Sequence, residues 1–245
     1  MLENKQFNDR RKMEKDFRDI VNSQCNVLEN EHFDYIHLVN SPDLTDVRPF
    51  TWNGWHSDVQ YAYYLDLDNF EGKISKDARW AINKATNEGI AVERCEDATI
   101  IWRLWTETFA RQHLRPPASE DFFKTMLVLM QNQNVGEMWI ARTKSDEVAA
   151  AEIFVYDHKR VYRWCAASST RLRKTDAPSL LLYEALRNLE NKGFKEINLM
   201  AATMPRLAMF VAQFNPRLVP YYSVIRKNAL AGIAEYWAPK LHLML

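Results

Sequence analysis

Residues 147–222 constrain the fold most, because their sequence pattern changes from strand to helix and back in a fixed order. Residues 147–156 and 160–168 are rich in β-branched, aromatic and alanine residues, and residues 157–159 between them favour a turn. This pattern predicts a β-hairpin. A basic loop, a helix, a strand, a short helix and a last strand are predicted to follow.

The helix after the basic loop carries both a start and a stop signal. Asp176 is a typical N-cap residue, Pro178 suits the first turn and Gly193 suits the position after the last turn. A strand predicted for residues 195–200 follows directly, which favours a βαβ crossover and hence one parallel strand pair. The predicted fold class is α/β (an α+β mixed sheet), with helices on both faces of a mostly antiparallel sheet.

Hydrophobic periodicity and helix-breaking residues predict the other elements. Helices are expected at residues 4–24, 74–88, 97–112, 119–132 and 228–237. Strands are expected at residues 33–39, 61–68, 90–94 and 219–226, and one more begins at Trp139. Residues 40–58 hold two prolines and two tryptophans and are expected to form an ordered loop.

The charges of the 245 residues cancel, since 32 are basic and 32 are acidic. No net field therefore draws the chain to nucleic acid or membrane, although local basic patches are compatible with this balance. Three separated cysteines, Cys25, Cys95 and Cys165, favour a reducing compartment, and a cytoplasmic location is expected. The sequence predicts neither a signal peptide nor a membrane-spanning helix.

Four stretches together carry a family resemblance. They are ISKDARWAINKATNEGIAVE, ETFARQHLRPP, DAPSLLLYEALRNLENKGFKEINL and MPRLAMFVAQFNPRLVPYYSV. Over residues 61–226 the sequence resembles the FemAB-like branch of the GNAT acyltransferase superfamily. The resemblance implies a GNAT-like fold, with a partial N-terminal half in residues 1–60 and a complete acyltransferase domain in residues 61–245.

The resemblance also implies the chemistry. An acyl group would pass to an amine, from acyl-CoA (acetyl-CoA) as in the wider superfamily, or from aminoacyl-tRNA as in the cell-wall enzymes. The acceptor would be a small molecule or an envelope precursor, and no metal is expected. Such a reaction needs neutralised donor phosphates, a neutral amine and donors to the oxyanion.

Similar GNAT enzymes hold the donor phosphates in a glycine-rich loop whose backbone amides face the pyrophosphate. The matching stretch here, residues 168–178, reads SSTRLRKTDAP and contains no glycine. The resemblance therefore predicts donor binding by the side chains of Ser168, Arg171, Arg173 and Lys174. A solvated basic loop is the alternative interpretation.

Glu152 is the one carboxylate in an apolar strand and is a candidate general base, because burial would raise its pKa. A two-residue turn at Asp157 and His158 would place Glu152 opposite Arg163. A cross-strand ion pair of structural character is therefore the alternative for Glu152.

Two further candidates lie on the last strands. Relatives often read FDFEGS where this chain reads INLMAA, so Asn198 replaces an aspartate and is expected to contact the acceptor. This departure is also compatible with a changed substrate, a base from elsewhere or lost activity. Tyr222 is a candidate acid toward a departing thiolate. Alternation along a strand allows only one of Tyr221 and Tyr222 to face the site, and a core aromatic is the alternative.

Loop residues supply the remaining substrate-binding candidates. His113 and Arg115 lie in RQHLRPP, where the resembling enzymes place acceptor-contacting loops, and a role at the helix end is the alternative for His113. Trp55 is a candidate to stack on a sugar or peptide, or else a loop anchor. The sequence contains neither HExxH nor GxSxG, so neither a zinc-protease site nor a serine-hydrolase site is expected.

Three functions remain open from the sequence. The first is an acyl-CoA-dependent N-acyltransferase, the second is an aminoacyl-tRNA-dependent enzyme, and the third is a GNAT-like binding module without catalysis. Overall neutrality weakens the tRNA alternative. The apolar stretch at residues 234–245 is a candidate homodimer contact or a last packed helix.

Overall fold

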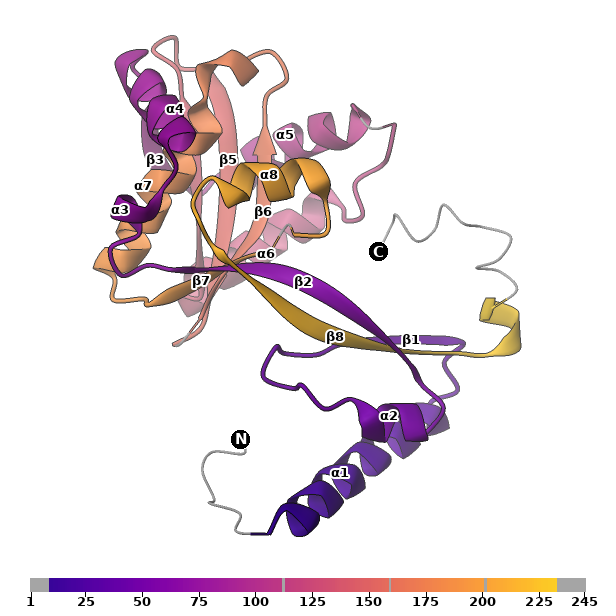
Figure 1. Cartoon of the computed structure of the whole chain (residues 1–245). Coiled ribbons are helices and arrows are strands. Elements are labelled where there is room, and N and C mark those ends of the chain that lie inside the picture. Colours follow the sequence, from indigo (N-terminus) through magenta and orange to yellow (C-terminus); the bar gives the residue numbers. More distant parts are fainter. Residues whose placement is uncertain (1–8, 112, 159, 201, 233–245) are drawn as a thin grey trace. The chain divides into compact units, whose positions relative to one another are not determined.

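The computed structural model describes residues 9–111, 113–158, 160–200 and 202–232 (Figure 1). The chain forms two compact units. Unit 1 contains Met1–Tyr61 and Pro220–Leu245, and unit 2 contains Ala62–Val219. Each unit is described by itself.

The helices and strands follow one another in an alternating order. The helices are α1 Arg10–Asn30, α2 Arg48–Trp52, α3 Phe70–Lys73, α4 Lys76–Asn87, α5 Ala98–Ala110, α6 Glu120–Gln133, η1 Arg173–Thr175 (a 3-10 turn), α7 Ala177–Asn191 and α8 Pro205–Ala212. The strands are β1 Tyr35–Val39, β2 His56–Asp66, β3 Ala91–Cys95, β4 Gly136–Arg142, β5 Val148–Tyr156, β6 Val161–Ser168, β7 Glu196–Met200 and β8 Arg217–Lys227.

The strands form a mixed sheet in the order β1-β8-β2-β7-β6-β5-β4-β3. The pairs β1–β8, β2–β7, β3–β4, β4–β5 and β5–β6 are antiparallel, whereas β6 and β7 are parallel. The crossover from β6 to β7 runs through α7, as a parallel pair requires. The predicted fold class and the predicted βαβ crossover are confirmed.

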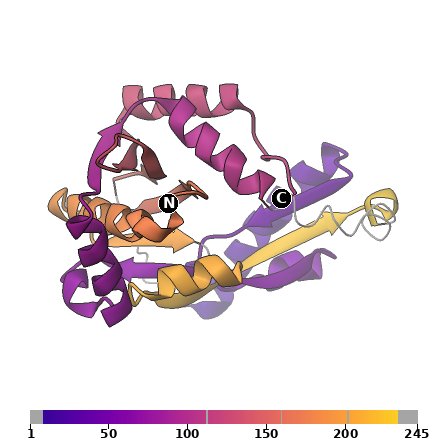
Figure 2. The ribbon, with the colours of Figure 1, turned by 90° about the horizontal axis from the view of Figure 1, so that it is seen from above.

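Helices cover both faces of the sheet in unit 2. Figure 2 shows α5 and α6 on one side of the strands and α4, α7 and α8 on the other. The first core contains Ile101, Leu104, Phe123, Leu127 and Ile153. The second core contains Ala78, Ile82, Leu181, Leu186 and Phe214. Each amphipathic helix thus buries its apolar face against one face of the sheet.

A bulge in β6 allows this strand to serve both cores. Ile153 pairs with Cys165 but Phe154 pairs with Arg163, so Trp164 is the extra residue. Beyond it, side-chain alternation is reversed. Cys165 therefore faces the core beside α5 and α6, whereas Val161 faces the core beside α4 and α7.

The ends of α4 and α7 carry local capping signals, with one exception. Ser75 caps α4 by accepting a hydrogen bond from the amide of Ala78 at 3.0 Å. Gly89 and Gly193, which follow α4 and α7, have φ values of 76° and 89° that suit glycine. Asp176 occupies the N-cap position of α7 but makes no side-chain capping bond.

Unit 1 has its own small core. Val21 and Cys25 of α1 pack with Phe50, Trp55 and Val224. The predicted first helix is confirmed in its described part but extends to Asn30, and the predicted loop 40–58 contains α2 and the start of β2. Of the predicted helix 228–237, residues 229–232 are helical and residues 233–237 lie outside the described part of the chain.

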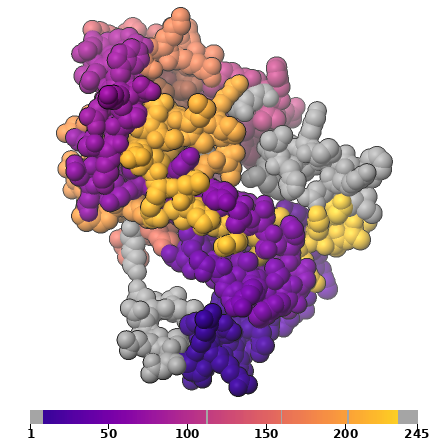
Figure 3. Space-filling view, viewed as in Figure 1, coloured from indigo at the N-terminus to yellow at the C-terminus, as the bar shows by residue number. Residues whose placement is uncertain are grey.

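Helix α8 contributes to the surface of unit 2, where Figure 3 shows its golden atoms. Val211 is buried against the sheet, while Met209 on the same helix is exposed. Within the described ranges, no helix combines the length and the apolar character needed to cross a bilayer.

Candidate functional site

The parallel strands β6 and β7 form a fork. Among the described residues, their pairing is limited to Val161 with Ile197 and Tyr162 with Asn198. The edge of β6 from Arg163 to Ala167 consequently has no strand partner on this side in the described part of the chain. Unpaired backbone groups along a strand edge can hydrogen bond an extended ligand. This edge leads from Asn198 to the basic loop that follows Ser168.

The last turn of α5 holds the start of the basic loop. Arg111 Nη1 donates to the carbonyl of Ser168 at 3.2 Å and to Thr170 Oγ1 at 2.5 Å. The amide of Thr170 donates to Glu107 Oε1 at 2.6 Å. Three hydrogen bonds from one helical turn therefore fix residues 168–170.

The charges in this region influence one another. Burial lowers the pKa of Arg111, and the positive charge of Arg173 lowers it further. Burial alone would raise the pKa of Glu107, but hydrogen bonds from Thr170 and the nearby Arg111 bring it below its ordinary value. The guanidinium groups of Arg111 and Arg173 are thus close enough to repel, and an anion bound beside them would relieve that repulsion.

Backbone amides at both ends of this loop are already engaged or missing. The amide of Thr170 is used by Glu107, and that of Ser179 donates to the carbonyl of Asp176 at 3.0 Å. Pro178 has no amide hydrogen, and the amide of Ala177 has a long hydrogen bond of 3.4 Å to Thr175 Oγ1. The cationic side chains of Arg171, Arg173 and Lys174 are therefore the candidate groups to meet an anionic donor at this loop.

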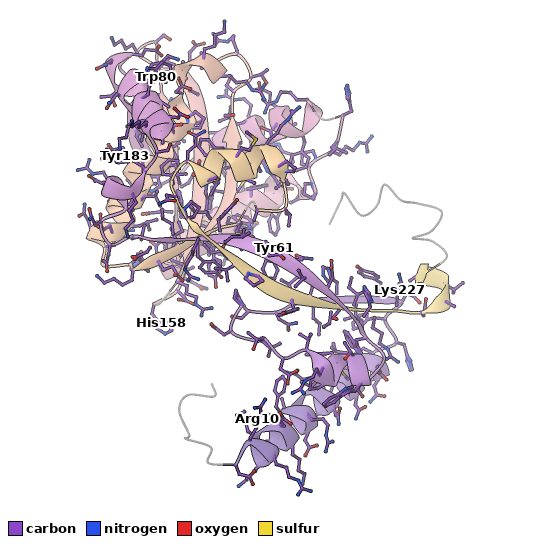
Figure 4. All side chains as sticks on the ribbon, viewed as in Figure 1. Arg10, Tyr61, Trp80, His158, Tyr183 and Lys227 are labelled. Carbon is purple, nitrogen blue, oxygen red and sulfur yellow. The ribbon has the colours of Figure 1, made fainter. Side chains whose placement is uncertain are left out.

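A lysine from α4 ties the other end of the loop. Lys84 Nζ donates to the carbonyl of Lys174 at 2.5 Å and to Asp176 Oδ2 at 2.7 Å. The hydrogen bond with Asp176 raises the pKa of Lys84. Lys84 also lies 5.3 Å from the ring centroid of Trp80, which projects from α4 (Figure 4). The carboxylate of Asp176 is thus engaged by Lys84 and not by an amide of α7.

Two of the four predicted donor-binding side chains lie in η1 and the other two precede it. Arg171 forms an ion pair with Glu147, so part of its charge is balanced. Arg173 and Lys174 lie in η1. Ser168 ends β6 and presents its carbonyl to Arg111. The four residues thus belong to one continuous segment next to the β6 edge.

Glu152 is buried in an ion pair with Arg163. Arg163 Nε donates to Glu152 Oε2 at 2.7 Å, and the two side chains are 6% and 2% exposed. Burial would lower the pKa of Arg163, but the charge of Glu152 outweighs it and raises that pKa. The predicted ion pair is confirmed, although Phe154 rather than Glu152 lies directly opposite Arg163. The catalytic role of Glu152 stays a prediction.

Asn198 belongs to a polar cluster at the base of the fork. Its Oδ1 accepts a hydrogen bond from the amide of Met200 at 2.8 Å, and its Nδ2 donates to Tyr64 Oη at 3.1 Å. Arg217 lies 5.2 Å from the ring centroid of Tyr64. Burial, with the nearby Tyr162, raises the pKa of Tyr64. The side-chain orientation of Asn198 is therefore fixed by two partners.

Two predicted residues lie in unit 1. Tyr222 on β8 lines a cavity of about 720 Å³ together with residues of α1 and of the segment 45–48. Trp55 is 3% exposed within the core of unit 1, and its indole nitrogen lacks a hydrogen-bond partner in the described structure. Trp55 thus lies where the loop-anchor alternative places it, and this burial gives no support to ligand stacking.

His113 and Arg115 lie in the connection between α5 and α6, and both are exposed. His113 has a φ of 57°, and its amide donates to the carbonyl of Ala110. Because Arg111 of the same connection holds the basic loop, this segment lies beside the candidate donor site. Their contact with a substrate stays a prediction.

A second cavity, of about 350 Å³, opens elsewhere in unit 2 between α4, α7, β3 and β4. Its lining includes Trp139, Leu180 and Asn188 but none of the residues of the fork, so we do not place the site there. Within the described residues, no three His, Cys, Asp or Glu side chains gather as a metal site would require.

Sequence reasoning missed Arg111, Glu107, Lys84 and Tyr64. Arg111 lies in the RQHLRPP stretch that drew attention to His113, but its partners are 57 and 59 residues away. Lys84 and its partner Asp176 are 92 residues apart. Local patterns carry no signal for such pairs.

Comparison with known proteins gives one family match. The family described as Acetyltransferase (GNAT) domain matches residues 72–205. This range contains the basic loop, the β6–β7 fork and Asn198. No curated protein sequence gives a significant match.

Solved structures share the fold at low sequence identity. The C-terminal domain of a candidate lysylphosphatidylglycerol synthetase from Agrobacterium fabrum is 16% identical, with a TM-score of 0.65 over 93% of this chain and 79% of that one. FemX is 9% identical, with a TM-score of 0.66 over 84% and 76%. L-PGS from Bacillus licheniformis is 13% identical, with a TM-score of 0.64 over 93% and 79%. At these identities the likeness concerns the fold alone.

Proposed function

This chain belongs to the GNAT acetyltransferase domain family, and from that premise we propose that it transfers an acyl group from acyl-CoA to an amine acceptor. The acceptor is an amine of a small molecule or of an envelope precursor. A cytoplasmic location is part of this proposal.

The observation that carries the proposal is the unpaired edge of β6 between Arg163 and Ala167. A strand rises about 3.3 Å per residue, so this edge can guide an extended donor arm over several residues. Arg173 and Lys174 then meet the phosphates of the carrier at its end, and the acyl group lies toward Asn198. The donor would thus extend along β6, from its phosphates at the basic loop to its acyl group near Asn198.

The reaction at the fork balances without a further reactant. The amine nitrogen attacks the thioester carbonyl, a C–N bond forms and the C–S bond breaks. The thiolate takes up the proton that the amine loses. In this proposal Asn198 and Tyr64 contact the acceptor, and hydrogen-bond donors near the thioester carbonyl would stabilise the oxyanion.

Glu152 and Tyr222 remain proposals for the proton transfers. Both carboxylate oxygens of Glu152 already accept hydrogen bonds from Arg163, so Glu152 would support catalysis better by fixing the strands beside the bulge. Tyr222 belongs to unit 1, and its role as an acid stays a prediction. A homodimer likewise stays a prediction.

Aminoacyl-tRNA is the second candidate donor. The observation that favours it is the amide of Thr170, which donates to Glu107 instead of facing a pyrophosphate. The names of two fold neighbours, lysylphosphatidylglycerol synthetase and L-PGS, also support an aminoacyl group as the acyl group.

Thermal unfolding with and without acetyl-CoA, coenzyme A and longer acyl-CoA esters tests the donor. A ligand at about 100 times its dissociation constant stabilises the folded protein by about 2.7 kcal/mol. The proposal expects a clear rise in Tm that is lost in Arg171→Ala/Arg173→Ala. The matched control is Lys12→Ala/Lys15→Ala, which removes two exposed cations from α1.

No shift with any thioester would overturn the acyl-CoA proposal. An aminoacyl-tRNA mimic that binds the wild type, but not the loop variant, would then support the second candidate. A protein that binds neither donor would correspond to the non-catalytic module.

A further inference from the structure

Five large apolar side chains are exposed in the chain segment of unit 2 that runs from the end of β7 through α8 to the start of β8. They are Met200, Met204, Leu207, Met209 and Leu218, and we call them the α8 surface. Met209 is 74% exposed and Met204 is 54% exposed. Exposed apolar groups gathered in one short segment mark an interaction surface more often than scattered ones do.

The geometry of α8 separates its inner and outer faces. Val211 is buried. At 100° per residue, Pro205, Arg206 and Met209 lie on the opposite face of the helix. The outer face of α8 therefore combines the thioether of Met209, the ring of Pro205 and the positive charge of Arg206.

The chain segment that contains α8 carries no acidic residue of its own. None of the chain's 32 acidic residues lies between Glu196 and Glu235. Within unit 2, this segment carries Arg206 and Arg217. Arg217 forms an ion pair with Glu196, whereas Arg206 is exposed and has no ion pair among the described residues. The α8 surface is thus apolar with a free positive charge.

We propose that the α8 surface docks on an anionic lipid bilayer. Methionine and leucine side chains would enter the boundary between headgroups and acyl chains, where flexible thioethers adapt to irregular surroundings. Arg206 would bind a lipid phosphate, and the lack of acidic residues avoids repulsion from the anionic surface.

The same features disfavour a second copy of this chain as the partner. A two-fold interface brings one surface against itself. Arg206 would then approach the α8 surface of the other copy, which offers no acidic residue between Glu196 and Glu235 to pair with it. Phosphate groups of a bilayer supply the charge that a second copy lacks.

The docking proposal does not depend on acyl transfer. Helix α8 follows β7, which carries Asn198 of the fork, so a docked α8 would bring that strand to the membrane surface. Binding to lipid and turnover of a donor are measured separately, and either can fail without the other.

Flotation of the full chain with vesicles tests the proposal. The probes are vesicles of phosphatidylglycerol mixed with phosphatidylcholine, and vesicles of phosphatidylcholine alone. We expect binding to the anionic vesicles that weakens in high salt. Met204→Ser/Met209→Ser should lower the partition constant about tenfold, because two apolar side chains no longer enter the lipid.

The control variant is Val128→Ser/Leu129→Ser, which changes two similarly exposed apolar residues on α6. It should bind as the wild type does, and circular dichroism checks that both variants are folded. Arg206→Ala should reduce binding to anionic vesicles alone.

Three results would overturn the proposal. The first is no binding to anionic vesicles, and the second is an equal loss in the α6 control. The third is a dimer in sedimentation velocity that Met204→Ser/Met209→Ser dissociates, which would assign the α8 surface to self-association.

Discussion

Arg163 on β6 donates from Nε to Oε2 of Glu152 on β5 at 2.7 Å, and both side chains are almost fully buried. The guanidinium also lies 5.6 Å from the ring centroid of Phe210 on α8. Two charged groups are thus enclosed between the sheet and a helix. Such a pair is costly to break but is replaced at little cost when both charges are removed together.

Arg163→Met should lower the free energy of unfolding by about 3–5 kcal/mol, because it leaves the carboxylate of Glu152 buried without a partner. Glu152→Leu/Arg163→Met should recover most of this loss. Urea unfolding measures both. Arg10→Met breaks an exposed ion pair with Glu14 and should cost less than about 1 kcal/mol. A loss in Arg163→Met as small as that of the control would contradict this account.

Asn198→Leu should reduce kcat/KM for the amine acceptor about tenfold, with little change in donor affinity, because one positioned hydrogen-bonding group is lost. It should also raise the pKa of Tyr64, since the hydrogen bond from Asn198 lowers that pKa at present. Acceptor kinetics at saturating donor and ultraviolet titration of the phenol measure the two effects. Asn191→Leu on α7 is the matched control, and an equal loss there would refute a specific role for Asn198.

Glu107 should make stability depend on pH in acid. Its pKa in the folded protein lies below the ordinary 4.5, so its contribution is present above that pH and is lost as the pH falls through the lower, folded value. The stability difference between wild type and Glu107→Gln should therefore shrink on acidification. The contribution at neutral pH is below about 1 kcal/mol because the group is partly exposed.

Unfolding by urea at several pH values measures this difference. Glu120→Gln, at an exposed i,i+4 ion pair with Lys124, is the control. A Glu107→Gln difference that grows as the pH falls would have the wrong sign and would reject the assigned hydrogen bonds.

The three cysteines should differ in reactivity. Burial raises the pKa of Cys165 to about 12 and also raises that of Cys25, whereas Cys95 is half-buried. Near pH 8 a thiol reagent should modify Cys95 first, and Cys165 at least about a hundredfold more slowly, because the thiolate is the reacting form. Mass spectrometry of the labelled protein measures the order. Cys95→Ser should remove the fast phase, and equally rapid labelling of Cys165 would show that this part of the fold opens.

The elements of unit 2 were predictable because their signals are local. Ser75, Gly89 and Gly193 delimit helices by their own conformational preferences, and the leucines of α7 show the helical period directly. The parallel pair followed from a short strand placed immediately after a helix. These predictions need no knowledge of distant residues.

The candidate site was predictable only in its loop residues. Arg171, Arg173 and Lys174 form a visible cluster, but the hydrogen bonds of Arg111 and Glu107 to residues 168–170 depend on how α5 packs. The register of the β5–β6 hairpin was missed by two positions, because the turn lies later than expected. Phe154 thus pairs with Arg163, and the ion pair forms diagonally on the same face.

The extra residue at Trp164 sets which core each side chain of β6 faces. Before the bulge, the side chain of Val161 faces the core beside α4 and α7. After the bulge, the side chains of Cys165 and Ala167 face the core beside α5 and α6, although all three residues have odd numbers. Deleting Trp164 would make Arg163 and Cys165 neighbours that pair in a regular ladder with Phe154 and Ile153, so both halves of β6 would keep the cores that they face now. The deletion would remove only the bulge and the ring contacts of Trp164 with Phe122 and Phe123.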